Sequence, residues 1–103
     1  MKIVAVTACI AGIAHTYMAK SAIEKAAKAR GAEIKVETQG SMGIENRISP
    51  EEVASADAVL FAVDTVVSDR GRFDGKPLVE VKTNDVVKDA ARVIDEVFAA
   101  VQQ

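Results

Sequence analysis

The feature that most constrains this chain is an apolar run over residues 3–8 that ends at Cys9, the only cysteine among 103 residues. The run is too short and too rich in branched side chains for a helix, and it is typical of a central β-strand covered on both faces. From Ala14 onward, alanines and Ile23 recur at helical spacing until Gly31, which is placed to end a helix. The sequence therefore predicts a strand, a loop and a helix, with Cys9 at the carboxyl end of the strand.

The predicted helix has no obvious side-chain cap at its start. Residues 10–14 contain no Ser, Thr, Asp or Asn, the residue types that usually accept hydrogen bonds from the first N–H groups of a helix. These N–H groups and the positive end of the helix dipole form an anion site, which a phosphate or a Cys9 thiolate could fill. The same field is expected to favour ionisation of the Cys9 thiol and to make it a better nucleophile near neutral pH.

These residues also have purely structural interpretations. A lone cysteine among Val and Ala is often a buried small hydrophobic residue, a lone histidine such as His15 is usually structural, and Gly12 could be an ordinary turn glycine. Position shifts the balance between the interpretations, because a crevice for ligands forms at the carboxyl ends of strands in open α/β sheets. A cysteine there, a glycine in the turn and an uncapped helix together favour a functional site.

The rest of the chain completes an α/β pattern. Residues 33–38 alternate polar and apolar as an edge strand would, residues 58–63 form a second uninterrupted apolar run, and residues 78–81 suit a short last strand. Ser49 with Pro50 and Glu52 predicts a capped short helix, and Thr83 or Asn84 is expected to cap a final helix. The fold class is therefore α/β, a three-layer sandwich with a four-stranded parallel sheet in the order 2-1-3-4, Rossmann-like or phosphatase-loop-like.

This strand order places the Cys9 loop at the switch point of the sheet. Residues in the loops after the neighbouring strands are then candidates to contact a phosphate or a partner, or they are ordinary turn residues: Gln39, Ser41, Asp64 and Thr65. Arg70 and Arg72 follow in a connecting stretch, where they either face a phosphate or are solvated surface arginines.

Composition excludes several classes of protein. The length and the hydrophobic half of the residues suit one domain over residues 1–103. No apolar run is long enough to span a bilayer, the start of the chain lacks a signal-peptide pattern, and a single cysteine fits a reducing cytoplasm. One Cys and one His do not make a usual zinc site, so no metal is expected, and the absence of a dense basic run gives nucleic-acid binding little support.

The segment from Cys9 to Thr16 resembles the Cys-Pro-Thr-Gly-Ile-Ala-His-Thr signature of fructose-type enzyme IIB components of the bacterial phosphoenolpyruvate-dependent sugar phosphotransferase system. Residues 36–43 and 72–77 resemble other recurrent segments of that family. The resemblance implies that Cys9 accepts phosphate from a phosphohistidine of a IIA partner and passes it to a fructose-like sugar in the membrane component IIC. The implied phosphate loop consists of Ile10, Ala11, Gly12, Ile13, Ala14, His15 and Thr16.

Two positions depart from that signature. Ile10 stands where the family often has proline and restores a backbone N–H, whereas Ala11 stands where it often has threonine and removes a hydroxyl. Neither change removes the reacting thiol. The resemblance further implies no cofactor and a cytoplasmic enzyme IIB domain that associates with the inner face of the membrane through IIC. On its own the chain is expected to be monomeric.

Two alternative functions use a similar loop differently. A low-molecular-weight phosphatase or an arsenate-reductase-like enzyme resembles a Cys-x5-Arg pattern, but the residue six after Cys9 is His15, so the bidentate guanidinium is missing. In a noncatalytic receiver-like or ligand-binding module, Cys9 would merely be a buried residue. A receiver requires an acidic pair after its first strand, where this chain has Thr7 and Ala8. Rapid labelling of the native thiol at neutral pH would argue against such a module.

Overall fold

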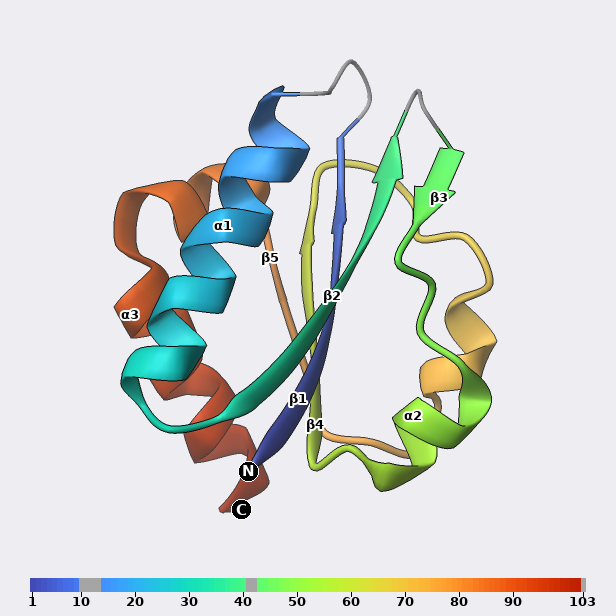
Figure 1. Cartoon of the computed structure of the whole chain (residues 1–103), viewed down its shortest axis with the longest axis vertical. Coiled ribbons are helices and arrows are strands. Elements are labelled where there is room, and N and C mark those ends of the chain that lie inside the picture. Colours follow the sequence, from blue (N-terminus) through green and yellow to red (C-terminus); the bar gives the residue numbers. More distant parts are fainter. Residues whose placement is uncertain (10–13, 41–42, 103) are drawn as a thin grey trace.

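The computed structural model describes residues 1–9, 14–40 and 43–102. A sheet lies between two layers, with helices α1 and α3 on one face and the short helix α2 with a 3-10 turn, η1, on the other (Figure 1). The elements in chain order are β1 (Lys2–Ala8), α1 (Ala14–Ala29), β2 (Glu33–Gly40), β3 (Gly43–Glu45), α2 (Pro50–Ser55), β4 (Ala58–Val63), η1 (Arg70–Phe73), β5 (Leu78–Val81) and α3 (Thr83–Val101).

The sheet has the order β3-β2-β1-β4-β5. Strand β1 pairs in parallel with β2 and β4, and β4 pairs in parallel with β5, so the α/β class and the predicted order of the four parallel strands are confirmed. In the register, Ala8 lies opposite both Gln39 and Val63. The chain therefore leaves the three central strands at the same edge of the sheet, just beyond Ala8.

Two expectations about the second strand need correction. The sheet contains a fifth strand, β3, which pairs antiparallel with the last three residues of β2, so β2 is an edge strand only up to Glu37. Gln39, which the sequence placed in the loop after this strand, instead continues β2 together with Gly40, and Gly43 already belongs to β3. Gly43 has a φ of +90°, a backbone conformation that glycine adopts easily and that suits a tight reversal.

Alternate residues of the central strands supply two hydrophobic cores. Ile3 and Ala5 of β1 face α1 and α3 and pack with Ile23 and Ile94, whereas Val4 and Val6 face the opposite layer. That second core also contains Ile48, Val53, Phe61 and Phe73. A strand covered on both faces needs such a continuous apolar run, which explains why residues 3–8 and 58–63 do not alternate with polar residues.

The predicted ends of the first two helices are confirmed. After α1, Gly31 adopts a φ of +74°, and the Ala32 N–H donates to the Ala27 carbonyl at 3.0 Å, as in a glycine-terminated helix. Before α2, the Glu52 N–H donates to Ser49 Oγ at 3.2 Å and the Ser49 N–H donates to Glu52 Oε1 at 2.9 Å. These two bonds form the capping box that the sequence predicted.

The expected cap of α3 is wrong. Thr83 is the first helical residue rather than the cap, and its hydroxyl is turned toward Asp64 at the end of β4. The cap position belongs to Lys82, whose N–H donates to Asp85 Oδ2 at 3.0 Å. Within residues 1–9, 14–40 and 43–102, no helix combines the length and apolar character needed to cross a lipid bilayer.

Candidate functional site

An open depression of about 340 Å³ lies at the carboxyl edge of the sheet. Its lining comes from the ends of β1 and β2 and from the segment after β4: Ala8, Cys9, Gln39, Gly40, Thr65, Val66 and Ser68. Three of the residues singled out from the sequence, Cys9, Gln39 and Thr65, thus meet in one place. Ile10, Ala11, Gly12, Ile13 and Ser41 lie outside the described residues, so their predicted contacts stay predictions.

Cys9 is half-buried, one residue beyond the end of β1. It therefore has the position predicted for it, and it is not enclosed in either hydrophobic core. A thiol in such a place is reachable from solvent while its backbone is held by a central strand. These are the requirements for a nucleophile that must meet a second molecule.

Asp64 joins the cysteine to the start of α3. Its N–H donates to the Ala8 carbonyl at 2.9 Å, and its carboxylate accepts the Thr83 hydroxyl at 2.6 Å and the Thr83 N–H at 3.2 Å. The hydrogen bond from the Thr83 hydroxyl, followed by those from the Thr83 N–H and the Cys9 thiol, holds the pKa of Asp64 below its ordinary value despite partial burial. Asp64 thus fixes the end of β4 against its neighbours and places a carboxylate beside the thiol.

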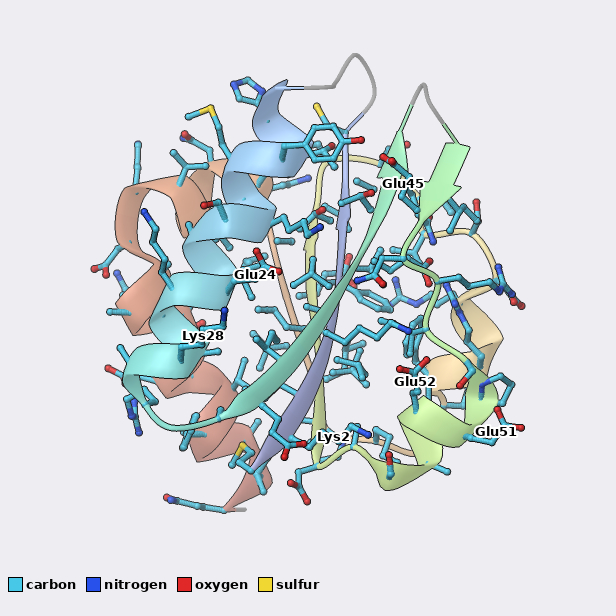
Figure 2. All side chains as sticks on the ribbon, in the orientation of Figure 1. Lys2, Glu24, Lys28, Glu45, Glu51 and Glu52 are labelled. Carbon is cyan, nitrogen blue, oxygen red and sulfur yellow. The ribbon has the colours of Figure 1, made fainter. Side chains whose placement is uncertain are left out.

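The first turn of α1 supplies three further side chains. His15 is exposed, whereas Thr16 is buried, and within the described residues its hydroxyl has no hydrogen-bond partner. Tyr17 donates its phenolic hydrogen to Glu45, and this bond raises the pKa of Tyr17 above its ordinary value. Figure 2 shows Glu45 on β3, at the end of the sheet where α1 begins. The contact ties the start of α1 to the outermost strand.

Beneath the depression lies a buried ion pair that the sequence did not predict. The Arg72 guanidinium donates to both carboxylate oxygens of Glu37, at 2.7 and 2.5 Å, and the two side chains are only 5% and 0% exposed. Burial alone would raise the pKa of Glu37, but hydrogen bonds from Arg72, the Ile48 N–H and Gln39 outweigh it and lower the pKa. Arg72 is thus not a solvated arginine, while Arg70 forms an exposed pair with Glu80.

Periodicity along β2 could have located Glu37, although not its partner Arg72. Glu37 lies two residues before Gln39, so both side chains leave β2 on the same face. Once Gln39 is considered for the site, Glu37 lies on the same face below it. Ser68 and Val66 also line the depression without having been singled out, because nothing in a connecting stretch reveals which of its residues fold back.

Comparison with protein families gives a match to the model described as "PTS system, Lactose/Cellobiose specific IIB subunit" over residues 4–96, where PTS denotes the phosphotransferase system. Among curated proteins, the chain is 51% identical over 102 residues to the "PTS system fructose-like EIIB component 2" of Escherichia coli K12, covering 99% of this chain and 96% of that one. It also matches 20% of the length of the "Fructose-like PTS system EIIBC component" of E. coli K12, at 48% identity over 96% of this chain.

Solved structures agree with these matches. A domain of a fructose-specific IIABC component from Borrelia burgdorferi superimposes with a TM-score of 0.91 at 48% identity, over 95% of this chain and 93% of that one. A predicted fructose-specific IIB from E. coli gives a TM-score of 0.95 at 33% identity, over 99% and 90% of the two chains. Sequence and fold therefore agree over nearly the whole length, and the chain belongs to the PTS IIB family, alongside relatives of the fructose-like type.

Proposed function

We propose that this chain is a phosphoryl carrier in which Cys9 is the residue that is phosphorylated. The observation that carries the proposal is the place of Cys9, half-buried in the lining of an open depression just beyond the end of β1, in a member of the PTS IIB family. Such a thiol can be approached by a protein that bears a phosphohistidine.

The proposed reaction has two transfers. In the first, the Cys9 thiolate attacks the phosphorus of a IIA phosphohistidine, so that an S–P bond forms, the N–P bond breaks and the imidazole leaves with the electron pair. In the second, a sugar hydroxyl attacks the phosphorus of the phosphocysteine, so that an O–P bond forms, the S–P bond breaks, the thiolate leaves with the electron pair and the hydroxyl proton passes to water. No bond to a metal or a nucleotide is needed for either step.

The loop is proposed to stabilise the equatorial oxygens through its backbone N–H groups, from Ile10 to His15. The Thr16 hydroxyl is proposed as a further donor to the phosphoryl group. It is buried and has no hydrogen-bond partner within the described residues, which supports this role. Donors that are already oriented stabilise the charge of a phosphoryl transition state without reorganisation. Flanking roles for Ser41 and Thr65 belong to the same proposal.

The second transfer is proposed to occur at the inner face of the membrane, on a fructose-like sugar held by a IIC component. Relatives whose names combine EIIB and EIIC in one chain support this partner, since fusion keeps two domains at high effective concentration. The names of these relatives also support fructose-like sugars over the lactose and cellobiose of the family model's description. The cytoplasm is the proposed location of the chain.

A phosphatase function has less support. An enzyme of that type needs a guanidinium over the phosphate, and of the described residues that line the depression none is an arginine. Arg72 is engaged by Glu37 beneath the depression. A carrier must also hydrolyse its phosphocysteine slowly, because hydrolysis would release the phosphoryl group before the sugar accepts it.

Intact-mass spectrometry at mildly alkaline pH tests the proposal. The protein is mixed with phosphoenolpyruvate, the general phosphotransferase proteins and a fructose-type IIA, with Cys9→Ser as the matched control. We expect one added phosphoryl group on the wild type alone, and its loss when IIC membranes and sugar are added. No adduct beside a demonstrably phosphorylated IIA would reject the carrier role, and rapid release of free phosphate would indicate a phosphatase instead.

A further inference from the structure

We propose that Gln39 is a positioning residue, which holds the wall of the Cys9 depression in a fixed place rather than binding the phosphoryl group itself. The wall is residues 64–69, called here the rim segment, of which Thr65, Val66 and Ser68 line the depression. This inference rests on the proposed phosphoryl transfer to Cys9. It adds a residue whose hydrogen bonds would set the rate of that transfer.

The Gln39 side chain is fully engaged with the protein. Its amide nitrogen donates to Glu37 Oε2 at 2.6 Å and to the Ser68 carbonyl at 3.3 Å, and its amide oxygen accepts the Ser68 N–H at 2.8 Å. A side-chain amide has two N–H donors, and both are used here. Gln39 therefore has no donor left for a phosphate oxygen, although the residue is only 7% exposed and borders the depression.

The ion pair below makes Gln39 a rigid anchor. Glu37, which accepts one of the Gln39 donors, is held by two bonds from Arg72 and by the Ile48 N–H at 2.8 Å. Arg72 also donates to the Ile48 carbonyl at 2.8 Å and to the Asp69 carbonyl at 3.1 Å. A charge-assisted network of this kind, removed from water, fixes the orientation of its members.

The rim segment is consequently fastened at both ends. Asp64 bonds to Ala8 and Thr83 at one end, while Gln39 holds Ser68 and Arg72 holds Asp69 at the other. Between these points Val67 is buried in the core, whereas Thr65 and Val66 are exposed. Val66 is 84% exposed.

Such a rim has its final shape before any partner arrives. A loop that is already ordered loses no further conformational entropy when a partner binds. Small displacements of reacting groups, by contrast, lower the rate of transfer strongly. Loss of the Gln39 bonds should let Ser68 drift from β2 and should move Thr65 away from the thiol. The expected effect is a displacement of groups around the thiol during phosphoryl transfer, not a weaker encounter with the donor. The maximal rate should therefore change more than the donor concentration at half-saturation.

The decisive variant is Gln39→Met, which keeps the length of the side chain and removes all three hydrogen bonds. The control is Val53→Ala, which destabilises the core of the same layer from α2, away from the depression. Two quantities are measured: hydrogen exchange of the Ser68 amide, and the single-turnover rate of Cys9 phosphorylation by phosphorylated IIA at saturating concentration.

In the wild type the Ser68 amide should be protected, and Gln39→Met should remove that protection. The maximal rate should fall about tenfold in Gln39→Met, with little change in half-saturation, while Val53→Ala keeps both properties. A Ser68 amide that exchanges in the wild type like an unstructured peptide would overturn the proposal even if the variant fails to fold. So would a wild-type rate in Gln39→Met, or an equal fall in Val53→Ala. Absence of phosphorylation in the wild type would instead reject the proposed function.

Discussion

At the level of single residues, the buried guanidinium of Arg72 is expected to contribute more to stability than the exposed guanidinium of Arg47. Removing one partner of a buried ion pair leaves an uncompensated charge, and Glu37 is completely buried. We predict that Arg72→Met lowers the free energy of unfolding by about 3–5 kcal/mol, measured by urea denaturation at neutral pH. Arg47→Met is the control, because Arg47 forms an exposed pair with Asp69, and it should cost about 0–1 kcal/mol.

The pH dependence of this difference tests its cause. In the wild type the pKa of Glu37 is lowered, so the ion pair stabilises the fold above the ordinary range of a glutamate and is lost as pH falls through the lowered pKa. In Arg72→Met the hydrogen bonds from the guanidinium are gone, so burial favours the protonated form of the Glu37 carboxyl. The gap in stability between wild type and Arg72→Met should therefore narrow on acidification. A gap that does not change with pH would show that lost packing, not charge, causes the effect.

The sequence correctly placed those candidate residues that follow a strand directly. Cys9, Asp64 and Thr65 were predictable because parallel strands end at a common edge, and the apolar runs before these residues define the ends clearly. The Glu37–Arg72 pair was not predictable, because the partners are 35 positions apart. Polar residues at alternate positions of a strand normally indicate a face exposed to solvent. Here the segment that carries Arg72 folds back over this face of β2 and buries Glu37.

At the level of elements, the capping box of α2 should make stability depend on pH. Hydrogen bonds from Lys35 and from the Ser49 N–H lower the pKa of Glu52 from 4.5 to about 2. A lowered folded-state pKa means that Glu52 stabilises the protein above about pH 4.5 and that this contribution is lost between pH 4.5 and 2. We predict that Glu52→Gln lowers the melting temperature at pH 7 and flattens its decline over that interval, as measured by circular dichroism.

Glu51→Gln is the matched control, since Glu51 lies in the same first turn of α2. Figure 2 shows Glu52 on the sheet side of α2 and Glu51 on its outer side. The control should retain the wild-type dependence on pH in this interval. Equal flattening in both variants would mean that the general negative charge near the helix start, and not the bonds of Glu52, produces the effect.

Elements were predictable where their signals are local. The capping box and the glycine stop of α1 lie within a few residues of the ends that they define, and both predictions were confirmed. Strand β3 has three residues, and its stability comes from pairing with β2, so it left no periodic pattern. The start of α3 depends on Asp64, which lies 19 residues before Thr83, and a local search for a cap could not find that contact.

At the level of the whole molecule, the two hydrophobic cores share their central strands. One core uses Ile3 and Ala5 of β1 and the other uses Val4 and Val6, so neither layer can detach without exposing one face of the same strand. Both layers should therefore unfold in one cooperative transition, as small single domains usually do.

Matched substitutions in the two layers test this cooperativity. Ile23 on α1 and Ile48 before α2 are both fully buried, one in each core, and Ile→Val deletes the same group from each. Each variant should lose about 0.5–1.5 kcal/mol, and the losses should add in the double variant because the side chains belong to different cores. Scanning calorimetry should then give one peak whose calorimetric and van't Hoff enthalpies agree in all four proteins. Two peaks, with each substitution moving only one of them, would show instead that the helical layer and the α2 layer unfold as separate units joined by the sheet.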